Sequence, residues 1–202
     1  MTKEEEILSA AEDEFFRNGY DATSTATIAK RAGVTHAMVN YYFRTKEQLF
    51  VKIIDSHIYG FLESLKKVMT AEGSFIHVVE GAATALFDKI NEDRKFPFII
   101  LDISRTHPEF LGRYRETVLT ICRGSVERHA QRLAEQIRAG KVADCTMGSI
   151  YDTVLNLAAA PFLNIPFLEN ISGYDAQRID RYLLSRREDM VKTIRKKYTT
   201  GS

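Results

Sequence analysis

Polar side chains that can bind nucleic acid are concentrated between residues 24 and 46. Asn40 has the amide geometry for paired hydrogen bonds to an adenine edge, and His36 can donate to guanine N7 or to a phosphate. Ala37 and Met38 are short or flexible enough to touch a thymine methyl group. The candidate contacts with duplex DNA are Ser24, Thr25, Thr27, Thr35, His36, Ala37, Met38, Asn40, Tyr41, Tyr42 and Lys46.

Phosphate contacts are expected where helices begin. Lys46 starts a long helix, and Ser24, Thr25 and Thr27 surround the start of a short one. Backbone N–H groups and the helix dipole favour an anion at such ends. These contacts position a protein on DNA, whereas the helix expected over 35–42 supplies the sequence choice.

For four side chains of that helix, the sequence allows two alternative roles. Either Tyr41 or Tyr42 donates its hydroxyl to a phosphate, and the other packs at the junction with the next helix. Asn40 either contacts a base or faces solvent. His36 is either a DNA contact or an exposed histidine without such a role.

The spacing of small and apolar residues from 25 to 43 predicts the elements that position these groups. Ala29 is small enough for two short helices to cross, and Gly33 accepts the positive φ of a tight turn. Ile28, Val34 and Val39 form a small core that fixes the angle of the second helix. That angle decides whether the helix fits a major groove. An ordinary helical hairpin with a glycine turn has part of the same spacing.

The local charge favours the helix-turn-helix interpretation over the ordinary hairpin. Residues 22–46 contain four cations and no acid, although residues 1–46 carry six cations against seven acids and the whole chain is only +1. DNA binding is therefore inferred from a local face without acidic residues and not from the net charge of the protein. The four cations are Lys30, Arg31, Arg44 and Lys46.

The composition limits the classes of protein to which the chain can belong. The 202 residues are 45% apolar and 27% charged, as in globular domains, with no apolar run near the roughly 20 residues that span a bilayer. The first residues do not resemble a signal peptide, so we expect a cytoplasmic protein without a membrane partner. Cys122 and Cys145 lack metal-site or redox spacing. Because enzyme motifs are absent, we expect no enzyme, catalytic residue, metal or cofactor.

Apolar residues recur every three or four positions, and glycine and proline are sparse, so the chain is expected to be all-α. We predict two domains, a helix-turn-helix domain over 1–46 and a larger helical domain over 47–202. About nine helices are expected, over 3–18, 25–32, 35–42, 46–73, 74–91, 97–105, 108–139, 146–163 and 175–198.

Several short motifs occur in register within the first fifty residues, at residues 7–11, 15–16, 19–23, 28–34, 41–43 and 46–50. Through these motifs the segment resembles the tetracycline-repressor (TetR/AcrR) family of transcriptional regulators. Asn40 departs from the family, which often has tyrosine there, so no phosphate-binding role is carried over to it. The resemblance implies a homodimeric, ligand-controlled protein that binds double-stranded DNA.

In the resembled family, helices four to eight enclose an effector pocket. Residues that combine an apolar face with an isolated polar group are the candidate lining, namely His57, Phe61, Phe87, His129 and Asn156. Many aromatic residues suggest an apolar or aromatic small molecule. We expect the apolar surfaces of the last two helices to form the homodimer.

The expected function is a ligand-responsive regulator, a repressor or an activator, that binds a palindromic operator and is released by its effector. The alternative is a DNA-binding protein of the same fold that answers to a protein partner or organises chromosome structure. The sequence identifies neither effector, operator nor regulated genes.

Overall fold

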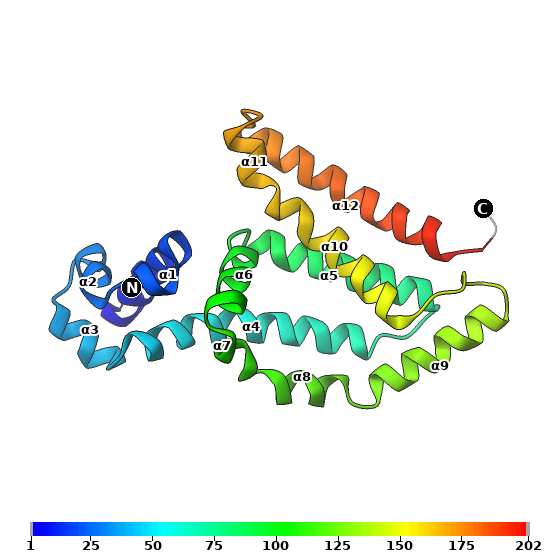
Figure 1. Ribbon diagram of the computed structural model, residues 1–202, viewed down its shortest axis with the longest axis horizontal. Coiled ribbons are helices and arrows are strands. Elements are labelled where there is room, and N and C mark those ends of the chain that lie inside the picture. Colours follow the sequence, from blue (N-terminus) through cyan, green and yellow to red (C-terminus); the bar gives the residue numbers. More distant parts are fainter. Residues whose placement is uncertain (1, 201–202) are drawn as a thin grey trace. The chain divides into compact units, whose positions relative to one another are not determined.

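The computed structural model describes residues 2–200, most of which are helical (Figure 1). Within this range no strand forms, and one isolated bridge joins Val142 to Thr199. Twelve helices occur in the described chain: α1 (Lys3–Ala22), α2 (Thr25–Ala32), α3 (His36–Phe43), α4 (Lys46–Met69), α5 (Phe75–Glu92), α6 (Phe96–Thr106), α7 (Pro108–Gly112), α8 (Arg115–Cys122), α9 (Ser125–Arg138), α10 (Met147–Leu163), α11 (Ile165–Asn170) and α12 (Ala176–Tyr198).

The chain divides into two compact units. Unit 1 comprises Met1–Gly60 with Phe98–Arg115, and unit 2 comprises Phe61–Pro97 with Glu116–Ser202. Both units therefore include part of α4 and part of α6. The functional boundary that we expect after residue 46 stays a prediction.

Helices α1 to α3 are set by local signals in unit 1. The Ser24 hydroxyl accepts a hydrogen bond from the Thr27 N–H and begins α2, and the Thr35 hydroxyl accepts one from the Met38 N–H and begins α3. Gly33 ends α2 at φ 65° and ψ 30°, the left-handed conformation that glycine adopts without steric cost. The predicted turn is confirmed.

Aromatic rings from distant parts of the sequence hold unit 1 together. The Phe50 ring lies 4.8 Å from Phe15, 4.7 Å from Tyr20 and 5.1 Å from Phe110, measured between centroids. Such pairs add about 0.5–1.5 kcal/mol each beyond the area that they bury. They fix α7, a segment some sixty residues further along the chain, against α1 and α4.

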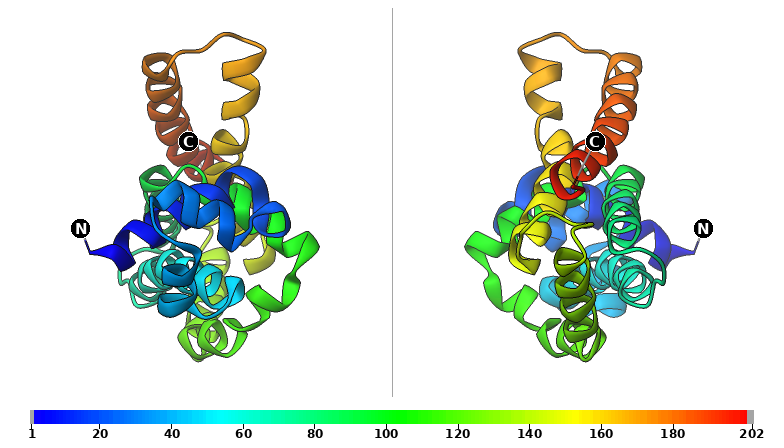
Figure 2. Two further views of the ribbon diagram at one scale, coloured as in Figure 1. Left: turned by 90° about the vertical axis from the view of Figure 1, so that its left-hand side faces the viewer. Right: turned by 90° about the vertical axis from the view of Figure 1, so that its right-hand side faces the viewer.

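Unit 2 is built on α5, which packs against α10 and α12, with α9 alongside (Figure 1). The Phe87 ring of α5 lies 4.8 Å from Phe162 of α10 at the centre of this core. Two ion pairs also join α12 to α5, Arg195 with the buried Glu80 and Arg187 with Asp88. Both views in Figure 2 show α10 and α12 joined at one end by the segment that contains α11.

The prediction of one helix over 108–139 is wrong, because the segment forms α7, α8 and α9. Gly124 has φ 69°, a left-handed conformation that separates α8 from α9. Tyr114, between α7 and α8, turns inward and donates its hydroxyl hydrogen to Asp55 over 2.5 Å. Apolar residues recur at helical spacing through the whole segment, so the sequence pattern did not indicate the breaks between α7 and α8 and between α8 and α9. Together with the short α11, they bring the helices of the described chain to twelve instead of about nine.

Among the described residues, no helix combines the length and the apolar character that crossing a bilayer requires.

We predict that Tyr198→Phe lowers the free energy of unfolding by about 1–2 kcal/mol. The Tyr198 side chain is 1% exposed, and its hydroxyl donates to the Ser149 carbonyl over 2.9 Å and lies 2.7 Å from the Thr153 hydroxyl. Urea unfolding checks the loss. Tyr41→Phe is the matched control and should stay within about 0.5 kcal/mol of the wild type, because Tyr41 is 81% exposed. Equal effects of the two variants would contradict the prediction.

Candidate nucleic-acid interface

The two faces of α3 have opposite environments. Val39 and Phe43 are 1% and 5% exposed and face the core of unit 1, where Ile28 and Ala29 of α2 are also buried. The predicted inward direction of Val39 and Phe43 is therefore confirmed. On the other face, His36, Ala37, Asn40 and Tyr41 are exposed. The polar face of α3 is thus open to a partner.

Three of the candidate contacts form a hydrogen-bonded row across α2 and α3. His36 Nε2 lies 2.8 Å from the Thr25 hydroxyl, and His36 Nδ1 lies 3.5 Å from the Asn40 side-chain nitrogen. When the Asn40 amide donates to Nδ1, the neutral ring carries its proton on Nε2 and donates to Thr25. This row holds the Asn40 amide beside His36, so the two side chains present one polar surface.

The hydroxyl groups at the helix starts already make internal hydrogen bonds. Ser24 and Thr27 cap α2 reciprocally, with each side chain accepting from the other residue's backbone N–H, and Thr35 caps α3. Ser24, Thr27 and Thr35 remain exposed, so their hydroxyls can accept a second partner. Thr25 is half-buried because it packs beside His36.

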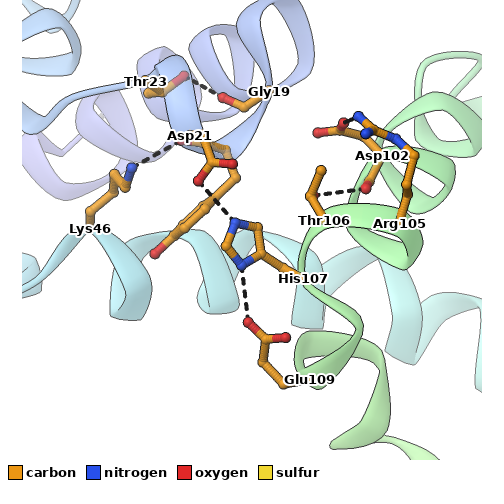
Figure 3. Close-up of polar contacts among 10 residues, drawn as sticks. Gly19, Asp21, Thr23, Lys46, Asp102, Arg105, Thr106, His107 and Glu109 are labelled. Atoms are coloured by element: carbon orange, nitrogen blue, oxygen red, sulfur yellow. Dashed lines mark hydrogen bonds and ion pairs between the residues drawn. The ribbon is translucent and has the colours of Figure 1, made fainter.

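Lys46 begins α4, as predicted, but its side chain turns back toward α1 (Figure 3). The ammonium donates to the Tyr20 carbonyl over 3.0 Å and lies 4.2 Å from the centre of the Tyr20 ring. Thr45 caps the helix by accepting from the Gln48 N–H. Lys46 therefore carries its charge close to the end of α1 and also offers its own backbone N–H at the start of α4.

The two tyrosines of α3 differ in exposure. The Tyr41 ring is 81% exposed, whereas the Tyr42 ring is 39% exposed and its centroid lies 6.3 Å from that of Phe43. The two tyrosine rings meet edge to face at 5.3 Å. Of the two alternatives, this arrangement favours Tyr41 as the phosphate contact and Tyr42 as the packed residue.

Two of the four local cations are engaged within unit 1, namely Lys46 with Tyr20 and Arg31 with an acid of α1. Arg31 lies 3.1 Å from the Glu14 carboxylate of α1, a contact that the pattern of charges in the sequence did not identify. Lys30 and Arg44 are exposed. The positive charge available to a duplex thus comes mainly from residues beside the turn and after α3.

Unit 2 contains an apolar cavity of about 190 Å³ between the end of α4 and helices α5, α9 and α10. Its wall contains no acidic, lysine or arginine side chain, and Ser64, His129 and Tyr151 are its polar residues. The apolar wall consists of Phe61, Leu65, Val68, Phe75, Val78, Val79, Ala82, Ala85, Leu86, Met147, Ile150, Val154 and Leu155. Such a wall suits an uncharged, apolar ligand.

The five predicted effector residues do not lie together. Phe61 and His129 line the cavity. Phe87 packs in the core of unit 2 against Phe162, and the exposed Asn156 donates to the carbonyl of Asp152 one turn earlier. His57 belongs to unit 1, where its ring lies 2.8 Å from a Glu12 oxygen and meets Phe16 edge to face.

The exposed helix α3 follows α2 after a glycine turn, which is the arrangement of a helix-turn-helix. Residues 7–53 match the family described as bacterial regulatory proteins of the tetR family. Over this segment the chain is similar to transcriptional regulators of the TetR family.

Three similar proteins illustrate the relationship. The transcriptional regulator QacR of Staphylococcus aureus is 36% identical over 67 residues, which cover 33% of this chain and 36% of QacR. The fatty acid metabolism regulator protein of Bacillus subtilis is 21% identical over 140 residues, or 69% of this chain and 70% of that protein. The structure of the ketosteroid transcriptional regulator KstR2 of Mycobacterium tuberculosis has a TM-score of 0.70 at 14% identity, over 99% of this chain and 96% of KstR2.

These comparisons differ in what they cover. The match to QacR spans about a third of the length of each protein. The likeness to KstR2 extends over the whole chain but concerns the fold. QacR and KstR2 are both named as transcriptional regulators.

Proposed function

We propose that the protein is a ligand-responsive transcriptional regulator, acting as a repressor, that binds a palindromic operator as a homodimer. A small, apolar or aromatic effector releases it from the DNA. The observation that supports DNA binding best is the open polar face of α3, with Asn40 held beside His36 and backed by the buried Val39. That face has the polar groups that read base edges in a major groove.

A homodimer is part of the proposal because one helix-turn-helix reads too few base pairs to select a site. Two copies of α3 about 34–36 Å apart would enter successive major grooves. Unit 2 exposes large apolar side chains on α10, α12 and the segment between them, and such patches mark interaction surfaces. They are Tyr151 (65% exposed), Leu155 (40%), Phe167 (60%), Ile171 (71%) and Leu184 (60%).

The cavity of unit 2 supports an uncharged effector. Its wall offers no countercharge, so a charged ligand would lose its hydration without compensation. An apolar cavity of about 150 Å³ already takes up benzene, which makes 190 Å³ sufficient for a small aromatic or short aliphatic molecule. His129, at 4% exposure, places one hydrogen-bonding group in the wall. The name of the Bacillus subtilis relative, which refers to fatty acid metabolism, agrees with an apolar effector.

Selection of bound duplexes from a random pool tests the DNA-binding part of the proposal. We expect a palindrome whose half-site centres lie about 10–10.5 base pairs apart or a multiple of that distance. Recovery of unrelated sequences would instead support the alternative of a chromosome-organising protein.

We predict that Asn40→Ala relaxes preference at particular base pairs, at a cost of about 1–3 kcal/mol on the selected site and little on random duplex. Lys46→Ala is the comparison variant and should weaken binding about equally on all sequences, because its contact is with phosphate or with the end of α1. Fluorescence anisotropy at fixed salt measures both. If both variants lost affinity uniformly, the assignment of Asn40 to a base would be wrong.

We predict that Leu184→Glu raises the dissociation constant of the dimer at least about tenfold, because the introduced carboxylate would be desolvated without a partner. Sedimentation equilibrium at micromolar concentration measures the change. Ser185→Glu adds the same charge to the neighbouring exposed position of α12 and should leave the wild-type mass unchanged. A wild-type protein that is monomeric, or equal effects of both variants, would contradict the proposed interface.

We predict that 1-octanol and naphthalene raise the thermal midpoint of the wild type, whereas octylammonium does not. A ligand at a hundred times its dissociation constant stabilises a folded protein by about 2.7 kcal/mol. Ala82→Leu fills the cavity from α5 and should abolish the rise, while Asn156→Leu, on the exposed face of α10, should retain it. Stabilisation by neither neutral probe would favour the alternative of control by a protein partner.

A further inference from the structure

Three successive residues at the end of α1 are each held by a different part of unit 1 (Figure 3). The Gly19 carbonyl accepts from the Thr23 hydroxyl over 2.8 Å, and the Tyr20 carbonyl accepts from Lys46 of α4 over 3.0 Å. The Asp21 carboxylate lies 2.9 Å from Nε2 of His107, which stands between α6 and α7. Because Ser24 caps α2 three residues after Asp21, these contacts set where the helix-turn-helix begins.

His107 is fixed from several directions. Its backbone N–H donates to the Ile103 carbonyl over 2.8 Å, at the end of α6. Its ring meets the Tyr20 ring edge to face at 5.0 Å and lies 5.5 Å from the Phe110 ring of α7. The side chain is 24% exposed, so its orientation is determined by packing as well as by its polar contacts.

Both ring nitrogens of His107 face carboxylates. Nε2 lies 2.9 Å from an Asp21 oxygen, and Nδ1 lies 3.0 Å from a Glu109 oxygen at the start of α7 (Figure 3). An ionised carboxylate only accepts hydrogen bonds, so each of these contacts needs an N–H on the ring. The neutral ring has a single N–H, and its other nitrogen would then present a lone pair to a carboxylate. Only the doubly protonated ring can keep both contacts.

The surrounding charges favour that doubly protonated form. The hydrogen bond to Asp21, followed by the one to Glu109, raises the pKa of His107 above its ordinary value of about 6.5. The pKa of Glu109 is lowered, first by its own backbone N–H and then by His107.

Two charged groups of α4 lie on the Tyr20 side of the site. Lys46 stands over the Tyr20 ring, and Glu47 contributes, after burial, to the raised pKa of the Tyr20 hydroxyl. Asp102 and Arg105 of α6 pair with one another near Gly19. Of these groups, the two carboxylates that contact the ring are the ones that set the protonation of His107.

We propose that His107 is a positioning residue for operator binding: its doubly protonated ring ties the start of α7 to the end of α1 and so holds the helix-turn-helix in place, and loss of one proton releases the end of α1. This inference rests on the proposed function and adds regulation by pH to it.

The sign of the pH dependence follows from the raised pKa. The tie is complete below about pH 6.5 and is lost as the pH rises through the raised pKa of His107. A released α1 end has more conformations to lose on binding, so operator affinity falls as the pH rises. A partly exposed pair of this kind changes the affinity by about two- to fivefold.

The test compares pH profiles of operator affinity for the full chain between about pH 6 and pH 8.5 at fixed salt, using the duplex selected by the wild type. We expect the wild type to lose about two- to fivefold more affinity over this range than His107→Gln, which keeps a donor but cannot be charged. His107→Arg carries a permanent charge and several donors, and should bind as tightly as the wild type at low pH across the whole range. His77→Gln removes an exposed histidine of α5 in unit 2 and is the control variant, which should keep the pH dependence of the wild type.

An NMR titration of the His107 ring gives a second readout that needs no DNA. We expect a midpoint above that of a solvated histidine in the wild type and a lower midpoint in Asp21→Asn, which removes the charge of the first partner. Asp21→Asn also serves if His107→Gln does not fold, and its affinity should fall at a lower pH than that of the wild type.

Three results would overturn the inference. The first is a wild-type profile that superimposes on that of His107→Gln, and the second is a His107→Arg variant that behaves like His107→Gln. The third is a His107 ring that titrates at or below the ordinary value. Failure of the proposed function would give another result. The protein would then bind no duplex specifically at any pH, while the His107 ring still titrated with a raised midpoint.

Discussion

The left-handed turn at Gly33 is the constraint on which the recognition surface depends. With φ 65° and ψ 30°, it ends α2 and lets the Val34 N–H return to the Ala29 carbonyl over 3.0 Å. This close return fixes the crossing of α2 and α3 without any large side chain between them, because Ala29 is small and buried. The outward direction of α3 follows from that crossing and from the burial of Val39. A side chain with a Cβ at residue 33 would strain the turn itself.

Much of unit 1 could be predicted from the sequence because its signals are local. Caps such as Ser24 and Thr35, the turn glycine and the three- and four-residue spacing of apolar side chains each act within a few positions of the chain. The contact between Lys46 and Tyr20 could not be predicted, because it joins residues 26 positions apart. The helix break at Gly124 could not be predicted either, because apolar residues recur at helical spacing on both sides of this glycine.

The cavity of unit 2 was the least predictable feature. A void arises where packed helices fail to fill the space between them, which depends on the meeting of four helices and not on one helical pattern. Of the residues chosen because a polar group stands alone on an apolar face, His129 lies in the cavity wall. Phe87 is covered by the Phe162 ring, and His57 contacts Glu12 of another helix. Which of them contact an effector stays a prediction.

The hydrogen-bonded row of Thr25, His36 and Asn40 also bears on how such a surface diversifies. None of the three is part of the buried core, so exchange of any one leaves the scaffold largely undisturbed. Yet the hydrogen bonds of the row link the three side chains: the tautomer of His36 and the orientation of the Asn40 amide depend on each other and on Thr25. Substitutions at these sites should thus show epistasis, and among divergent descendants the three positions should covary as one unit.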